Sequence, residues 1–336
     1  MPSPRRSNRH HERYRHFSNI TRASERYWPR RRQNDSMSSS PIREILRAVA
    51  EDTCGILPKL LKALQTERDA RKSIKFSTTN LPFLEPLPIP LHPRPATIKV
   101  INEDTLNAAI WLLASGKPGH SGDSRPAVLN FANSRKPGGG WMNGAMAQEE
   151  TICYRSSLAL SLHPRLYPLN KYEGLYSPYV LVMREDMASG HHRIDVEPEK
   201  LPVVSVLTVP ALRNPKIRRF ELRASYSVAG EPPTANMRLK DKEVFYYDED
   251  RDITKGKMRL ALRMAAQHGH CKLVLGALGC GVFGNPPEDI AHCWLSVLRE
   301  NEFSGNRWSE VCFAIYDPKD EGNYEIFNGI LSGQEV

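Results

Sequence analysis

The sequence predicts an α/β fold with a mostly parallel central sheet. From about residue 97 to residue 331, short apolar segments typical of buried strands alternate with longer segments of helical periodicity. Apolar residues make up 40% of the 336-residue chain, which is enough for one large core or two modest ones. The mean hydropathy is −0.50, and no apolar run approaches the ~18 residues of a membrane span, so we expect a soluble protein.

The segment before this alternation has a different character. Residues 41–66 place Ile42, Ile45, Leu46 and Val49 at helical spacing and predict one or two helices, with Pro58 interrupting the run or beginning the second. Residues 81–97 contain six prolines and predict an extended connector. We therefore expect a disordered Arg-rich tail over 1–40, a helical extension and Pro-rich connector over 41–96, and one α/β domain over 97–336.

The elements of this domain follow in order. Strands are expected at 97–101, 127–132, 179–184, 203–210, 272–278 and 311–316. Helices are expected at 104–115, 151–162, 254–268, 286–299 and 322–331. The helix over 286–299 is the clearest, because two prolines suit its first turn and its apolar residues form one stripe. Residues 228–252 are polar and contain prolines, which predicts a long loop or insertion.

The net charge of +9 is concentrated at the N-terminus, where residues 1–36 hold ten arginines and three acidic residues. This segment is interpreted as a solvated tail, with a mitochondrial transit peptide or a polyanion-binding arm as alternatives. The six cysteines are scattered and form no CxxC pair, which favours reduced thiols over a disulfide framework or a zinc site. We expect a cytoplasmic or nuclear protein, or a mitochondrial one if the tail is a transit peptide.

Two glycine-rich loops follow predicted strands. The first runs from Asn130 and Asn133 to the triplet 138–140, and the second is GCGVFGNP over 279–286. Ligands of open α/β sheets bind at the carboxyl ends of strands, and glycines let backbone N–H groups approach phosphate oxygens. The second loop also matches G-x-G-x-x-G, but it precedes the last predicted strand, whereas a dinucleotide-binding fingerprint belongs to the first strand–helix turn. A phosphate-binding loop of another topology is favoured over a nicotinamide site.

Two adjacent acids, Glu149 and Glu150, stand at the predicted start of the 151–162 helix. Adjacent helical residues do not face each other, so they cannot flank one bond as a glycosidase pair does. They can divide the work, one facing the reacting centre and the other facing substrate hydroxyls or solvent. Taken alone, Gln-Glu-Glu at a helix start more often only complements the helix dipole.

The combination is more specific than its parts. A GGG and a QEE separated by the seven residues WMNGAMA, an upstream NxAN and a downstream GxGVFGNP together resemble the microbial-type branch of the poly(ADP-ribose) glycohydrolases. The resemblance runs from the 41–66 segment to about residue 331. It implies a macrodomain-like, three-layer α/β/α fold and a hydrolase that cleaves ribose–ribose glycosidic bonds. Poly(ADP-ribose) and proteins modified by it would be the substrates, and ADP-ribose the product.

The resemblance also implies roles for individual residues. Glu150 would be the catalytic general acid, Glu149 would hold ribose hydroxyls, and Gln148 would order the loop. The remaining expected substrate contacts are Asn130, Asn133, Gly138, Gly139, Gly140, Gly279, Gly281, Val282, Phe283, Gly284 and Asn285. Among them, Phe283 would pack on the terminal ribose, and the glycines would approach the diphosphate. The animal enzymes carry an acid at the place of Asn130, so this residue would only position substrate.

Several alternatives stay open. The same signature fits a mono-ADP-ribosyl hydrolase or a non-catalytic ADP-ribose reader, although a reader has no need of an acid. We expect a monomer that needs no cofactor or metal and makes no membrane contact. His191 and His192 are expected on a polar loop surface. Cys280 is interpreted as a small packing residue, because no histidine is visibly tied to it.

Overall fold

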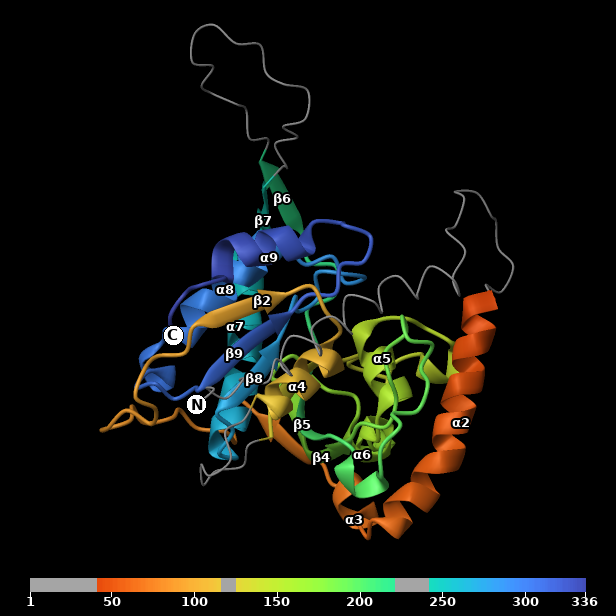
Figure 1. Ribbon diagram of the computed structural model, residues 1–336. Helices are drawn as coiled ribbons and strands as arrows, with labels where there is room; N and C mark the ends of the chain where they lie inside the picture. The colour runs from red at the N-terminus through yellow and green to blue at the C-terminus, as the bar shows by residue number, and fades with distance from the viewer. Residues whose placement is uncertain (1–40, 116–124, 221–241) are drawn as a thin grey trace, which may run out of the picture.

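A seven-stranded sheet forms the centre of the protein (Figure 1). The computed structural model describes residues 41–115, 125–220 and 242–336. The strand order is β1-β4-β5-β3-β8-β9-β2. The strands are β1 (Ile74–Ser77), β4 (Glu173–Leu181), β5 (Val203–Val209), β3 (Ala127–Phe131), β8 (Lys272–Leu275), β9 (Glu310–Ala314) and β2 (Ile98–Ile101). The five from β5 to β2 pair in parallel, and β4 alone runs opposite to the other six strands, because it is antiparallel to both β1 and β5.

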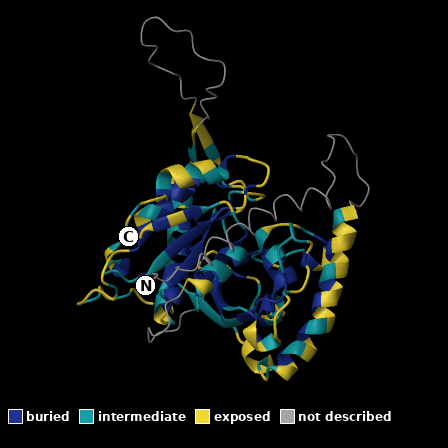
Figure 2. Cartoon of the chain, in the orientation of Figure 1, coloured by how far each residue is buried: buried dark blue, intermediate teal, exposed yellow. Residues whose placement is uncertain are grey.

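Helices cover both faces of this sheet, which gives the three layers that the sequence predicts (Figure 1). One face carries α4 (Thr105–Ala114), α5 (Gln148–Arg155) and α6 (Leu158–Ser161), and the other carries α7 (Asp248–Gln267), α8 (Pro287–Leu298) and α9 (Asn323–Leu331). Successive residues of β3 alternate between the faces: Val128 packs under α4 and α5, and Leu129 under α7 and α8. The inner strands β5, β3, β8 and β9 are buried along most of their length (Figure 2).

The N-terminal extension is one helix, α2 (Pro41–Ala63), so the predicted interruption at Pro58 is wrong. Proline removes one helical hydrogen bond, the one to the carbonyl four residues back, at Cys54. Both residues are exposed, so water can satisfy that carbonyl. The buried side of the helix continues unbroken through Thr53, Leu57 and Leu61. No helix of the described residues is long and apolar enough to cross a membrane.

Several other boundaries differ from the prediction. The helix expected at 151–162 begins three residues earlier and divides into α5 and α6, because Ser156 adopts extended backbone. The strand β4 begins at Glu173 instead of 179. Between the expected helical segment and the proline-rich connector, β1 joins the sheet as an edge strand after the short helix α3 (Glu67–Ala70). The proline-rich part after it forms neither helix nor strand up to the bridge residue Thr97.

The expected loop over 228–252 lies partly outside the described residues. Its described part is ordered: β7 (Lys242–Phe245) pairs with β6 (Ile217–Phe220), and α7 begins at Asp248, six residues earlier than expected. Three acidic residues in the first turn of α7 explain this early start, because they interact favourably with the helix dipole. The Arg-rich tail over 1–40 also lies outside the described residues, and the domain boundary at residue 96 stays a prediction.

Candidate active site

Both glycine-rich loops leave the same edge of the sheet. The strands β3 and β8 are parallel neighbours, paired at Ala127–Leu273, so the loops that follow them start side by side. They also touch: a Cβ on Gly276, the first residue after β8, would lie 2.7 Å from the ring of Phe131, the last residue of β3. The predicted placement of the two loops at one carboxyl edge is confirmed.

The GGG triplet forms a tight turn in front of the acids. Gly138 and Gly139 have φ values of 67° and 60°, a region that side chains with a Cβ rarely adopt. A Cβ on Gly139 would lie 2.3 Å from Oε1 of Glu150 and 3.2 Å from Oε2 of Glu149. The glycine at 139 therefore permits both the backbone conformation and the approach of the carboxylates.

The two acids of α5 are both buried and face different partners. Glu149 is 2% exposed and Glu150 8% exposed. Glu150 Oε1 accepts a hydrogen bond from the N–H of Gly140 at 2.8 Å. Glu149 Oε2 accepts one from the N–H of Asn133 at 2.7 Å, and its Oε1 lies 3.5 Å from Asn130 Nδ2. The acids therefore have different hydrogen-bond partners: Glu150 bonds to the glycine turn, and Glu149 bonds to the segment that follows β3 while also lying close to the turn.

Burial also changes the protonation of Glu149. The pKa of Glu149 is raised to about 8, mainly by desolvation and in part by the charge of Glu150, against the lowering effect of the hydrogen bond from Asn133. Glu149 therefore holds a proton at neutral pH in the ligand-free protein. The depth of Glu149 explains this effect, since it is the more deeply buried of the two acids.

Gln148 fastens the start of α5 to the sheet. Its Oε1 accepts a hydrogen bond from the N–H of Phe131 at 2.8 Å, and its Nε2 donates to the carbonyl of Leu129 at 2.7 Å. Nε2 also donates to Thr105 Oγ1 of α4 at 3.2 Å. These bonds hold the helix start against β3, and they fix the direction in which Glu149 and Glu150 leave the helix.

Asn130 and Asn133 both reach the site from β3. Asn130 is fully buried, and its Nδ2 donates to Thr208 Oγ1 of β5 at 3.2 Å. The side chain of Asn133 turns back on its own loop, where its Oδ1 accepts from the N–H groups of Arg135 and Lys136. Asn133 therefore contacts Glu149 through its backbone and shapes the loop through its side chain.

Gly279 and Asn285 determine the shape of the second loop. Gly279 has φ 79°, and a Cβ there would lie 2.4 Å from Nδ2 of Asn285. That amide group is buried and donates to the carbonyls of Gly279 and Leu212, at 3.1 and 2.7 Å. Val282 is 85% exposed at the tip. Asn285 therefore closes the loop from within, and its described contacts are structural.

A third loop, which the sequence analysis did not single out, braces the second. It follows β5, and the N–H of Asn214 donates to the carbonyl of Phe283 at 2.8 Å. The sequence signal for it was weak: PALRNP over 210–215 is a proline-bounded turn at the end of a buried strand. A buried network beside α5 was also missed, in which Arg155 pairs with Asp104, the N-cap of α4.

The histidine and cysteine expectations are partly corrected. His192 is exposed, as expected, but His191 is buried, at 4% exposed. Burial lowers the pKa of His191 to about 4, so this residue is neutral and packs near the ring of Tyr154. Within the described residues, no three His, Cys, Asp or Glu side chains cluster as a metal site would require. Desolvation raises the pKa of the Cys280 thiol, which disfavours the thiolate.

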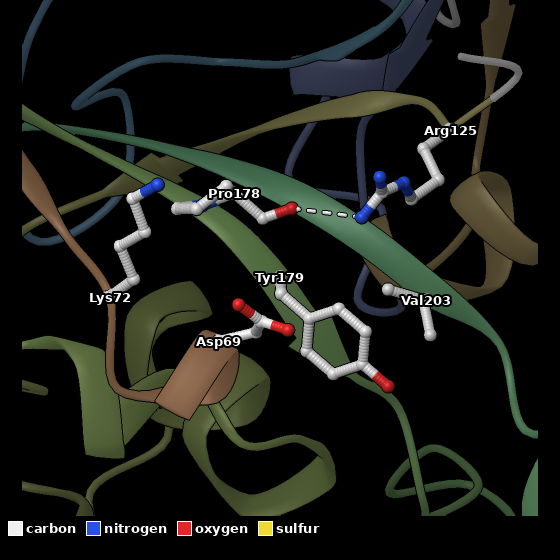
Figure 3. Close-up of a pocket in the computed structure, with 6 residues that line it drawn as sticks. All are labelled: Asp69, Lys72, Arg125, Pro178, Tyr179 and Val203. Carbon is white, nitrogen blue, oxygen red and sulfur yellow. Dashed lines mark hydrogen bonds between the residues drawn. The ribbon is translucent and has the colours of Figure 1, made fainter. Parts of the chain in front are cut away.

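Two cavities lie at the opposite edge of the sheet. One, of about 420 Å³, lies where β3 and β5 begin, and Arg125 there donates a hydrogen bond to the carbonyl of Pro178 (Figure 3). Its lining residues are Asp69, Lys72, Arg125, Pro178, Tyr179 and Val203. A second cavity lies near the amino ends of β2 and β9. Neither contains the paired acids or the glycine loops, so the site is assigned from the chemistry of its residues rather than from cavity size.

Comparisons with known proteins bear on this arrangement. Residues 50–185 match the family model described as microbial-type PARG (poly(ADP-ribose) glycohydrolase), catalytic domain. Over these residues the chain is similar to the catalytic domain of microbial-type PARG. The matched segment contains β3, the GGG turn and the QEE of α5. The resemblance predicted from the sequence is confirmed.

Solved PARG structures extend the likeness beyond the matched segment. PARG from Thermomonospora curvata is 26% identical, with a TM-score of 0.65 over 85% of this chain and 99% of its own. The same enzyme bound to the inhibitor ADP-HPD matches with a TM-score of 0.63. PARG from Deinococcus radiodurans in complex with ADP-ribose is 27% identical, with a TM-score of 0.52 over 70% of this chain and 84% of its own. A search of curated protein sequences gave no match.

The PARG likeness confirms the fold and the enzyme class. The mostly parallel sheet with helices on both faces is the architecture shared with the PARG structures. The roles of individual residues are a separate matter. The second loop, at 279–285, lies outside the segment that matches the family model, so its role rests on its position at the same carboxyl edge of the sheet as the acids.

Proposed function

We propose that this PARG-type enzyme hydrolyses the ribose–ribose bonds of poly(ADP-ribose), with Glu150 as the general acid, and releases ADP-ribose. One observation carries the assignment of the acid. The carboxylate of Glu150 is held by the Gly140 N–H against a turn in which residue 139 has no room for a side chain. A substrate ribose at this turn would meet Glu150 before the more deeply buried Glu149.

The second loop offers a matching anion site. Three successive backbone N–H groups, those of Gly281, Val282 and Phe283, have no hydrogen-bond acceptor among the described residues. Successive N–H groups of this kind form a concave site for phosphate oxygens, and the start of α8 lies directly behind them. A diphosphate bound here would lie at the same sheet edge as the acids.

The chemistry follows from this arrangement. As the glycosidic bond breaks, positive charge develops at the anomeric carbon, and the departing ribose oxygen takes the proton of Glu150. A bound diphosphate favours the protonated form of Glu150, because a nearby negative charge disfavours ionisation. Neutral Glu149 adds no charge of its own and can bind ribose hydroxyls. Water then attacks the anomeric carbon, activated either by Glu150 as a base or by the diphosphate of the substrate.

The proposal is tested by incubating the protein with poly(ADP-ribosyl)ated protein, with EDTA present, and measuring free ADP-ribose. Wild type should release it, and Glu150→Gln should not, while still binding ADP-ribose in calorimetry. Near-full turnover by Glu150→Gln would remove Glu150 from this role. Binding without release by wild type would favour a reader, release only from mono-ADP-ribosylated protein would favour the mono-ADP-ribosyl hydrolase, and loss of activity with EDTA would indicate a metal-dependent enzyme.

A further inference from the structure

A two-stranded hairpin, β6 and β7, stands off the body of the protein beyond α9 (Figure 1). Its two faces differ in composition. Paired residues of an antiparallel ribbon point to the same side, and successive residues alternate. One face holds the pairs Ile217–Phe245 and Arg219–Glu243. Phe245 packs into the core, and Arg219 is neutralised by Glu243 at 2.7 Å.

The opposite face carries cations and aromatic rings and none of the described acids. The pairs there are Arg218–Val244 and Phe220–Lys242, and Lys216 and Tyr246 continue this face at the base. Lys216, Arg218 and Lys242 are exposed, and no carboxylate of the described residues pairs with them. We call the residues Lys216, Arg218, Phe220, Lys242, Tyr246 and Tyr247 the hairpin surface.

The rings of this surface are held by the cations and remain accessible. Nζ of Lys216 lies 4.0 Å from the ring centre of Tyr246, and the Arg218 guanidinium lies 4.9 Å from the same centre. Tyr246 and Tyr247 meet edge to face, at 4.8 Å between ring centres. They are 40% and 52% exposed, and Phe220 is 44% exposed. Exposed aromatic rings beside unpaired cations are the arrangement that binds stacked bases and phosphates of single-stranded polymers.

The hairpin is anchored beside the candidate active site at both of its strands. The outgoing strand begins three residues after Asn214, whose N–H donates to the carbonyl of Phe283 in the second loop. The returning strand ends at Phe245, whose N–H donates to Asp289 Oδ2, in the first turn of α8, at 2.8 Å. One anchor is therefore in the second loop itself, and the other is in the first turn of the helix that follows this loop. A polymer with one diphosphate in the second loop would continue toward this face.

We infer that the hairpin surface binds poly(ADP-ribose) units beyond the one that is cleaved, with adenine stacking on the exposed rings and diphosphates pairing with Lys216 and Arg218. This inference rests on the proposed function for the identity of the polymer. Charge favours such an occupant, because this face offers only positive charge among the described residues and every unit of the polymer carries a diphosphate. Continuity with the diphosphate loop favours the substrate over an unrelated nucleic acid.

The test compares long and short substrates. The double variant Lys216→Glu/Arg218→Glu should raise KM about tenfold on polymer of many units, and Tyr247→Ala by a similar factor, since stacking of one base is worth roughly that much. The same variants should cleave an ADP-ribose dimer with unchanged kcat/KM. The matched control Lys59→Glu/Lys62→Glu makes the same charge change on exposed residues near the end of α2, and it should leave both substrates unaffected.

Binding is measured separately in the Glu150→Gln background, so that this inference and the proposed function can fail independently. The hairpin variant should lower the slope of log Kd against log salt for long polymer by about 1.4, as expected when two phosphate contacts are lost. If wild type cleaves nothing but this hairpin-dependent binding persists, the hydrolase proposal fails and the surface assignment stands. Equal losses on dimer and polymer, no loss on either, or equally tight hairpin-dependent binding of single-stranded RNA would each overturn the inference.

Discussion

A single methyl group at residue 139 should separate the carboxylate of Glu150 from its working position. In Gly139→Ala the new Cβ would lie 2.3 Å from Glu150 Oε1 and 3.0 Å from its Cδ, whereas ordinary contacts begin at 3.4 Å. The acid must therefore move by about 1 Å, and a displacement of that size can cost roughly 100-fold in rate. We expect kcat on poly(ADP-ribose) to fall by that factor.

The same substitution also strains the backbone, and a control separates the two effects. Alanine in the left-handed region costs about 1–2 kcal/mol of folding free energy. Gly269 has φ 74°, and a Cβ added there would meet no atom within 4 Å, so Gly269→Ala carries the strain without the collision. Both variants should lower Tm to a similar degree, and only Gly139→Ala should lose activity. If Gly139→Ala keeps kcat within threefold of wild type, the turn does not position the acid.

Three further predictions concern stability and the second loop. The pKa of Glu149 is raised from 4.5 to about 8, so its contribution to stability is fully present below pH 4.5 and is lost as pH rises through 8. Between pH 5 and pH 8, the free energy of unfolding of Glu149→Gln should therefore fall by about 3 kcal/mol less than that of wild type, as measured by denaturant unfolding. Asn285→Ala removes two buried hydrogen bonds to loop carbonyls and should raise KM severalfold while costing about 1–3 kcal/mol in stability, measured by kinetics and calorimetry; unchanged KM would show that the loop does not bind substrate. Gly144→Ala places a Cβ 2.4 Å from the carbonyl oxygen of Arg43 in α2 and should lower the free energy of unfolding by about 2 kcal/mol; an unchanged denaturation midpoint would show that α2 packs loosely there.

Strand and helix alternation predicted the sheet well, because strands buried on both faces are nearly continuous apolar runs such as AVLNF and KLVL. The edge strand β1 and the hairpin strands were missed because they are half-buried or exposed, and short polar strands give no such signal. Pro58 was misjudged because sequence does not show which side of a helix faces water. Tertiary placement decided each of these cases.

The candidate site, like the fold, was only partly predictable from the sequence. Glycine spacing and the QEE motif located the turn, the acids and the second loop, since local sequence determines those elements. The raised pKa of Glu149 could not be predicted, because it depends on how deeply α5 packs against β3. The brace from Asn214 to Phe283 joins loops almost 70 residues apart, and a contact of that kind leaves no trace in a single sequence.

The division of roles between Glu149 and Glu150 is the central claim, and a change of leaving group tests it most directly. A general acid contributes about 100- to 10,000-fold when the leaving group is a poor one such as a ribose hydroxyl, and little when the leaving group needs no proton. On ADP-ribose carrying nitrophenol at the anomeric carbon, Glu150→Gln should recover to within about tenfold of wild type. Glu149→Gln should show the same defect on both substrates. Recovery by Glu149→Gln, with Glu150→Gln equally impaired on both substrates, would contradict the assignment and give the proton to Glu149.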